Sequence, residues 1–246
     1  MTTEDPRTIL VVGATGATGR RLVAELLERG YGVRVIVRSA HRLPGRIRDH
    51  EMLSIVETDL LDLSDDEMRE QVDGCTAIAS CLGHNMTLKG IYGSPRKLVT
   101  AATRRLCEAV EATRPSHPVR FVLMNTAGNS IRDEEVSFAE RCVVGLIRLL
   151  LPPHRDNEEA ADHLQNHIGQ DHRFIEWVIV RPDSLIDEDE VTGYTVHPSP
   201  TRSAIFNAGK ASRINVAYFM AELATDDTTW NKWKGRMPVI YNKVFS

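Results

Sequence analysis

Three glycines follow an apolar run at intervals of three in the stretch ILVVGATGATGR, residues 9–20. A residue without a Cβ is needed where the backbone turns with positive φ or lies close to another group. A helix that begins after such a loop offers free N–H groups and a partial positive charge, which bind phosphate. The spacing is GxxGxxG rather than GxGxxG, and the alternative is a glycine-rich turn without a ligand. The residues predicted to bind the pyrophosphate of a dinucleotide are Gly13, Thr15, Gly16, Ala17, Thr18 and Gly19.

A basic residue ends the next β-rich run, VRVIVRSAHR. Arg38 lies 38 − 19 = 19 residues beyond Gly19. An Asp or Glu at this place binds the ribose 2′-hydroxyl of NAD, whereas a basic residue favours the 2′-phosphate of NADP. Ser39 adds a hydrogen-bond donor, and His41 and Arg42 add positive charge. The sequence therefore predicts NADP(H) as the cofactor, and the alternative is a solvated arginine at a strand end.

A strand–helix–strand unit must position these residues, and the flanking sequence predicts one. Residues 9–12 and 33–37 are short β-rich runs, and the leucines and valines between them share one face of a helix. Further strands are predicted at 52–57, 76–82, 120–124 and 177–180, and further helices at 64–72, 94–112 and 156–167. This alternation predicts an α/β fold with a doubly wound, mostly parallel sheet of the Rossmann-like type.

The chain shows no linker rich in Pro, Gly or Ser and no repeat, which predicts a single domain over residues 1–246. After Ser184 the sequence predicts loops, a helix at 216–225 and a short strand at 238–241. We expect residues 184–246 to contribute most of a small substrate-side lobe over the carboxyl edge of the sheet, where ligands bind in such folds.

The net charge of −4 gives no electrostatic reason to expect nucleic acid or an anionic membrane as a partner. The first residues lack the features of a secretion signal, and the four cysteines have no CxxC spacing, so we expect a cytoplasmic protein with reduced thiols. The apolar segment CVVGLIRLLLPP, residues 142–153, is too short to span a bilayer. It is predicted to be a core helix, a wall of the substrate pocket or a dimer contact, in a monomer or homodimer.

The segments GATGATGR, VIVRSAHRLP, VETDLLD, SCLGHN and VIVRPDSL together resemble the atypical short-chain dehydrogenases/reductases. The likeness is greatest to the NAD(P)H-binding branch that includes NmrA-like proteins and biliverdin-IXβ/flavin reductases. The resemblance implies the phosphate loop and 2′-phosphate site already described. It further implies an adenine contact at Asp59 and Leu60, a ribose contact at Cys81, Leu82 and Gly83, and a nicotinamide site with Asn125, Thr126, Pro182, Asp183 and Ser184.

One departure from that resemblance concerns the proton donor. Short-chain dehydrogenases carry a Tyr and a Lys four residues apart on one helix, but no tyrosine of this chain has Lys at i+4. Tyr92 precedes Lys97 by five residues and follows the fourth strand rather than the fifth. Near the expected position stand His154 and Glu158, four residues apart. Thr126 and His154 are therefore the candidate catalytic residues, and the alternative for the His–Glu pair is a surface contact.

A second histidine-rich stretch, DHLQNHIGQDHR, has a spacing that could suggest a metal site. His163 and His167 would share a helix face, but no HExxH motif is present, so a solvated polar face is favoured and no metal is predicted.

The sequence as a whole predicts an NADPH-dependent reductase that transfers hydride to a small, unidentified substrate without the Tyr–Lys pair. The alternative is a non-catalytic NADP(H)-binding sensor of the NmrA type. A third interpretation is an epimerase or dehydratase acting on a nucleotide-linked sugar. The chain leaves little room for the large substrate lobe that such enzymes carry.

Overall fold

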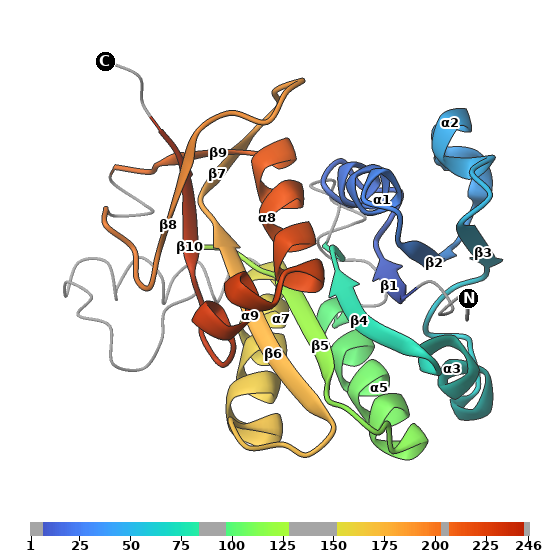
Figure 1. The fold of residues 1–246 in the computed structure, drawn as a ribbon. Helices are drawn as coiled ribbons and strands as arrows, with labels where there is room; N and C mark the ends of the chain where they lie inside the picture. Colours follow the sequence, from blue (N-terminus) through green and yellow to red (C-terminus); the bar gives the residue numbers. More distant parts are fainter. Residues whose placement is uncertain (1–6, 84–96, 128–151, 203–206, 244–246) are drawn as a thin grey trace.

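The computed structural model describes residues 7–83, 97–127, 152–202 and 207–243. The described strands form an eight-stranded sheet in the order β3-β2-β1-β4-β5-β6-β10-β8 (Figure 1). Neighbouring strands are parallel, except that β8 runs antiparallel to β10. The predicted doubly wound, mostly parallel sheet is confirmed. The strands are β1 (Thr8–Val12), β2 (Gly32–Val37), β3 (Leu53–Glu57), β4 (Cys75–Ser80), β5 (Val119–Met124), β6 (Ile175–Pro182), β8 (Tyr194–His197) and β10 (Val239–Asn242).

Helices cover both faces of the sheet because the inner strands are apolar on both sides. In β1, Ile9 and Val11 belong to one apolar cluster and Leu10 and Val12 to the opposite one, all at most 1% exposed. The first cluster includes α1 (Gly19–Glu28), α8 (Arg213–Thr225) and α9 (Asp227–Trp233). The second includes α3 (Asp65–Val72), α5 (Leu98–Thr113) and α7 (Pro152–Asp162), on the other face in Figure 1.

The two helices that pack side by side on that second face begin in different ways. At α3, the Ser64 hydroxyl accepts a hydrogen bond from Glu67 N, and the Glu67 carboxylate accepts one from Ser64 N. This capping box confirms the predicted start of the helix. At α5 the preceding Lys97 supplies no side-chain cap. The buried carboxylate of Asp156 in α7 accepts instead, from amides of the first turn of α5.

Two predicted elements need correction. The helix predicted at 156–167 begins earlier, and after Asp162 it continues as the π-helical segment η2 (His163–Ile168), which ends at Gly169 with a φ of 72°. Leu164 and Ile168 of this segment are both buried in the core. The strand predicted at 177–180 runs instead from Ile175 to Pro182, because pairing with β5 and β10 extends it at both ends.

Much of the chain after Ser184 belongs to the main layers: α8 packs on the sheet, and β10 and β8 extend it. A separate two-stranded sheet joins β7 (Ser184–Ile186) to β9 (Lys210–Ser212). Two short elements, η1 (Ala40–Arg42) and α2 (Gly45–Arg48), connect β2 to β3. The substrate-side role of residues 184–246 stays a prediction. Tyr92 and most of the segment 142–153 lie outside the described residues.

Candidate functional site

The glycine loop joins β1 to α1 beside β4, at the point where the strand order reverses. Gly13 has a φ of 75°, and a Cβ there would lie 2.5 Å from the backbone carbon of Cys81. A Cβ at Gly19 would overlap the carbonyl oxygen of Gly13. Close packing of strand, loop and helix therefore requires these two glycines.

Gly16 has different surroundings. The one atom within 4 Å of a Cβ placed there is the Gly13 carbonyl oxygen, at 3.2 Å. The amides of Thr15, Ala17 and Thr18 donate to no backbone carbonyl in the part of the chain that the structure describes. Thr18 precedes α1 and gives no side-chain cap. The loop therefore presents amides in front of a helix N-terminus, an arrangement that suits a pyrophosphate.

The end of β2 presents a cation. Arg38 is exposed, and its guanidinium makes no ion pair or hydrogen bond with another described residue. Thr58 N donates to Val37 O at 2.8 Å, which brings Asp59 beside this end of β2. The Asp59 carboxylate accepts from Leu61 N at 3.1 Å, so it shapes its own turn. The arrangement leaves Arg38 available for an external anion.

The segment after β4 lies against the glycine loop. Cys81 N donates to Val12 O at 2.9 Å, and burial raises the pKa of the Cys81 thiol to about 12, so this cysteine is no nucleophile at neutral pH. Leu82 is half-buried, and Gly83 is exposed with nothing within 4 Å of a Cβ placed there. Their position beside the loop fits the expected ribose contact, which stays a prediction.

The end of β5 is tied to α7. Asn125 Nδ2 donates to Asn157 O at 2.8 Å, and Asn125 Oδ1 accepts from Thr126 N at 2.8 Å. The backbone amide of Asn125 donates to Val180 O in β6. Asn125 thereby fixes the position of Thr126 at the carboxyl edge of the sheet.

The end of β6 lies beside that of β5, because Ala127 N donates to Pro182 O at 2.9 Å. The Asp183 carboxylate accepts from Gly209 N at 2.7 Å, and Ser184 N donates to Gly209 O. Burial raises the pKa of Asp183 above its usual value, although these amides and Arg202 act in the opposite direction. The predicted nicotinamide-end residues therefore meet at one edge.

His154 and Glu158 lie on α7, the next described helix after β5. The His154 Nε2 and Glu158 Oε1 atoms are 3.3 Å apart, and the two side chains are only 12% and 14% exposed. The alternative, a surface contact between His154 and Glu158, does not match these exposed fractions, because both side chains are mostly buried.

The histidines of the stretch DHLQNHIGQDHR do not all lie together. The rings of His163 and His167 stack with centroids 4.8 Å apart, whereas His172 pairs with Glu111. Burial, together with His167 and Arg104, lowers the pKa of His163 to about 4. Among the described residues no group of three or more His, Cys, Asp or Glu side chains is placed to hold a metal ion.

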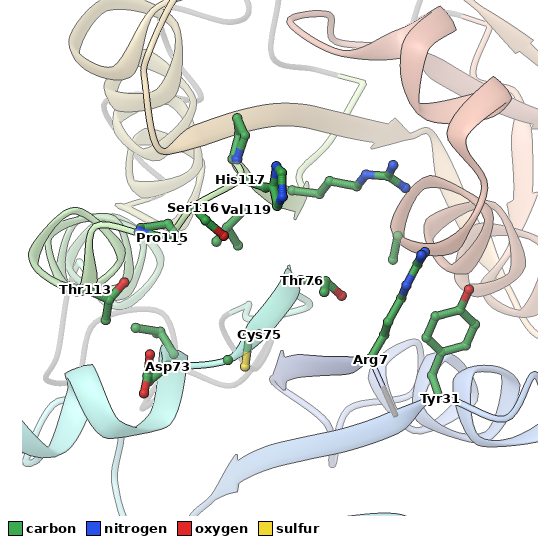
Figure 2. A pocket seen from close by; sticks show the side chains of 15 residues that line it. Arg7, Tyr31, Asp73, Cys75, Thr76, Thr113, Pro115, Ser116, His117 and Val119 are labelled. Carbon is green, nitrogen blue, oxygen red and sulfur yellow. The ribbon is translucent and has the colours of Figure 1, made fainter. Parts of the chain in front are cut away.

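A pocket of about 460 Å³ lies at the opposite, amino-terminal end of the strands. Figure 2 shows Arg7 and Tyr31 on one side of it and Thr113 and Pro115 on the other. Its lining contains none of the predicted site residues. The pocket is thus separate from the edge that carries the candidate site.

Sequence reasoning missed four residues at the carboxyl edge, on the β8–β10 side. Tyr241 and Arg202 lie against Gly209, and the ring of His197 lies 5.9 Å from that of Tyr241. Arg181 in β6 is fully buried, and its Nε donates to Met237 O at 2.7 Å. A charged residue ending the apolar run VIVR was a signal for Arg181, but no local pattern marks the other three.

The glycine loop at a strand-order reversal, with a cation at the end of β2, defines a dinucleotide-binding protein of the Rossmann type. A family model described as NAD(P)H-binding matches residues 13–227. The chain belongs to this NAD(P)H-binding family, so the sequence resemblance is confirmed, and so is the predicted cofactor at the level of NAD(P)H.

Curated relatives match about half of the chain. Protein TIC 62 of Arabidopsis thaliana is 28% identical over 137 residues, which are 50% of this chain and 21% of that protein. An uncharacterized chloroplastic protein of the same plant is 31% identical over 119 residues, 48% of this chain and 40% of that protein. The chain thus spans less than half the length of these relatives. Both are named chloroplastic, and the cytoplasmic location stays a prediction.

Solved structures match nearly the whole chain. A short-chain dehydrogenase/reductase from Veillonella parvula in complex with NADP has a TM-score of 0.68 at 15% identity, covering 97% of this chain and 95% of that one. An oxidoreductase from Lactococcus lactis has a TM-score of 0.69 at 18% identity, covering 97% and 92%. These similarities confirm the fold. Within the described residues no helix has both the length and the apolar character to span a membrane.

Proposed function

We propose that the protein is an NADPH-dependent reductase that transfers hydride to a small conjugated or quinone-like acceptor without a Tyr–Lys pair. The observation that carries the proposal is the pairing of unused amides in the glycine loop with the exposed Arg38. The amides of Thr15, Ala17 and Thr18 donate to no backbone carbonyl, and Arg38 has no carboxylate partner, among the described residues. A guanidinium in this position matches the 2′-phosphate that distinguishes NADPH from NADH.

The remaining cofactor contacts follow the carboxyl edge of the sheet. The free amides of Thr15, Ala17 and Thr18 would bind the pyrophosphate, and Ser39 would donate to the 2′-phosphate beside Arg38. The adenine would lie next to Asp59 and Leu60, and the ribose would pass Cys81, Leu82 and Gly83. NADPH, when bound, supplies the hydride. Asn125, Pro182, Asp183 and Ser184 would enclose the nicotinamide end.

Two side chains would act at the reacting end. The Thr126 hydroxyl would orient the carboxamide of the nicotinamide or an oxygen of the substrate. His154, whose Nε2 lies 3.3 Å from Glu158 Oε1, would pass a proton between solvent and the substrate oxygen. We further propose that the chain works as a single domain with residues 184–246 on the substrate side, and that the protein is a monomer or homodimer in the cytoplasm.

The test has two steps. Calorimetry should show tighter binding of NADPH than of NADH, and equal affinities would overturn the assignment of Arg38. A screen of NADPH oxidation at 340 nm against quinones, flavins and small carbonyl compounds should then reveal turnover.

A non-catalytic sensor is the second candidate, because a His–Glu pair occupies the helix on which the Tyr–Lys pair is expected. Tight NADPH binding without turnover of any acceptor would favour it over the reductase.

A further inference from the structure

Asp187 forms a bridge between two helices on the same face of the sheet. It directly follows β7, and its Oδ1 lies 3.3 Å from Arg21 Nη2 in α1. Its Oδ2 lies 3.0 Å from Arg213 Nη1 in the first turn of α8. The two helices, α1 and α8, pack against each other (Figure 1). One carboxylate therefore joins the start of the helix after the glycine loop to the start of α8.

The next residue, Glu188, anchors the same loop to the sheet. Its two carboxylate oxygens each lie 3.1 Å from Asn242 Nδ2, which donates to them from the end of β10. The Thr192 hydroxyl donates to the same carboxylate at 3.0 Å. The loop after β7 is thus held by β10 on one side and by two guanidinium groups on the other, which fixes where the Asp187 carboxylate lies.

Arg21 contacts the glycine loop with the other arm of the same guanidinium. Its Nη1 donates to Ala17 O at 2.8 Å, while its Nη2 faces Asp187. The backbone amide of Arg21 donates to Thr18 O, so in the described part of the chain no backbone amide serves Ala17 O. The Arg21 side chain supplies the missing donor at this helix start. It thereby joins the loop to Asp187.

The contact with Ala17 O sets the direction of the next amide. A trans peptide is planar, so the Ala17 carbonyl and the Thr18 N–H point to opposite sides of it. With the carbonyl held by Arg21, the Thr18 amide faces away from Arg21, and it donates to no backbone carbonyl among the described residues. This amide is one of the three that the proposed function assigns to the pyrophosphate. Arg21 can therefore act on that site through the backbone.

We propose that Asp187 is a positioning residue for the cofactor. It holds Arg21, which orients the peptide between Ala17 and Thr18 for binding of the pyrophosphate. The inference rests on the dinucleotide site of the proposed function and not on hydride transfer. A donor that is already oriented costs less to order when the ligand binds, so the role should appear as affinity for NADPH. Because the segment of Asp187 begins at Ser184, the substrate side would contribute to that affinity.

The sign of the effect separates this role from general electrostatics. NADPH is an anion, so the loss of a carboxylate near its site should by charge alone strengthen binding or leave it unchanged. We expect the opposite for Asp187→Asn, a weakening of about threefold or more measured by calorimetry. Asp187 is 65% exposed, so the variant should fold. Asp189→Asn, which removes the same charge from an exposed position on the same loop, is the matched control and should not weaken binding.

A double-mutant cycle tests whether the effect passes through Arg21. Arg21→Met keeps much of the aliphatic stem and should weaken NADPH binding about tenfold, because a charged donor to the loop is lost. In that background Asp187→Asn should have no further effect. Arg20→Met, at the exposed neighbouring residue, measures the contribution of charge alone and should cause a smaller loss. Arg213→Met, which removes the partner of Asp187 on the α8 side, should also cause a smaller loss.

The outcomes separate this inference from the proposed function. An Asp187→Asn protein that binds NADPH as tightly as wild type, or more tightly, overturns the inference and leaves the proposed function standing. An undiminished loss from Asp187→Asn in the Arg21→Met background also overturns it. Equal falls in melting temperature for Asp187→Asn and Arg213→Met, with unchanged NADPH affinity, would show a purely structural bridge. The expected losses of affinity in a protein that reduces no acceptor would support the inference and contradict hydride transfer.

Discussion

The carboxyl edge of the sheet has two halves that are built in different ways. Around β1, β2 and β4, the turns are closed by local contacts, since Gly16 N donates to Gly13 O and Leu61 N to the Asp59 carboxylate, and a few contacts such as Cys81 N with Val12 O join distant segments. Around β5, β6 and β10, the important contacts join residues far apart in sequence. Asp183 holds Gly209 across 26 positions. The half predicted to bind the cofactor, which we call the cofactor half, is therefore encoded largely in short motifs. The half predicted to bind the substrate, the substrate half, depends more on contacts between distant segments.

The two ends of the strands differ as well. The carboxyl edge carries an exposed arginine, Arg38, and loop amides that have no partner among the described residues. At the amino-terminal pocket of Figure 2, Arg120 is already paired with Asp227 and lies over the ring of Trp230. The predicted site depends instead on backbone amides and a guanidinium that no other described group uses, which is what recognition of a phosphate requires.

The largest effect should come from Gly16→Val, which tests whether the glycine loop of the cofactor half binds NADPH. The new Cβ would lie 3.2 Å from the Gly13 carbonyl oxygen, a tight contact that a small backbone shift relieves, and the rest of the side chain would extend into the predicted pyrophosphate site. We expect NADPH affinity to fall at least about hundredfold, or roughly 2.7 kcal/mol, with the far-UV circular dichroism spectrum unchanged.

Gly19→Val is the contrasting variant, since its Cβ would overlap the Gly13 carbonyl oxygen and should prevent folding. A Gly16→Val protein with wild-type affinity for NADPH would show that all three glycines serve packing only.

Asp156→Ala tests the long-range half. The carboxylate accepts from Val99 N at 2.8 Å and Thr100 N at 2.9 Å, and these amides would lose their charged partner inside the protein. The free energy of unfolding in urea should fall by about 2–3 kcal/mol. Glu159→Ala, which removes a partly exposed pair with Lys97, should cost about 1 kcal/mol or less. Equal losses in the two variants would contradict the capping role.

Arg38→Ala tests the cofactor half again, and the expected loss of NADPH affinity is smaller than for Gly16→Val. A guanidinium–phosphate contact contributes about 1.5–3 kcal/mol, so NADPH binding should weaken about tenfold or more. NADH, which lacks the 2′-phosphate, should bind with little change. Calorimetry with both dinucleotides measures the difference, and Arg46→Ala, at an exposed arginine on the nearby α2, is the matched control. A parallel loss for NADH would mean that Arg38 contributes general positive charge only.

The contrast between local and long-range contacts also explains which features the sequence could predict. The apolar run, the three glycines and Arg38 lie within 30 residues, and their periodicity specifies strand, loop, helix and strand without knowledge of the rest. Ser64 and Glu67 likewise form a local capping box. Nothing local shows that Asp156 caps α5.

The neighbours of Tyr241 are equally remote, because Gly209 and His197 meet its ring through strand pairing and loop packing. The sequence also placed the helix at 216–225 in a substrate-side lobe, although α8 packs on the main sheet. It packs against α1 and against β4, β5 and β6, all of which lie far from it in the sequence.

Thr126→Val should give the smallest effect and tests whether the two halves meet in one reaction. Asn125 fixes the backbone amide of Thr126 at 2.8 Å, so the substitution, which is close in shape, should leave the loop in place. The hydroxyl is too weak an acid to be the main proton source, and its proposed task is orientation. We therefore expect kcat for a quinone acceptor to fall several-fold, or roughly 1 kcal/mol, with NADPH affinity unchanged. Thr126→Ser keeps the hydroxyl and should restore most of the rate. If instead both variants lost NADPH affinity equally, Thr126 would belong to the cofactor half, and the boundary drawn between β4 and β5 would have to move.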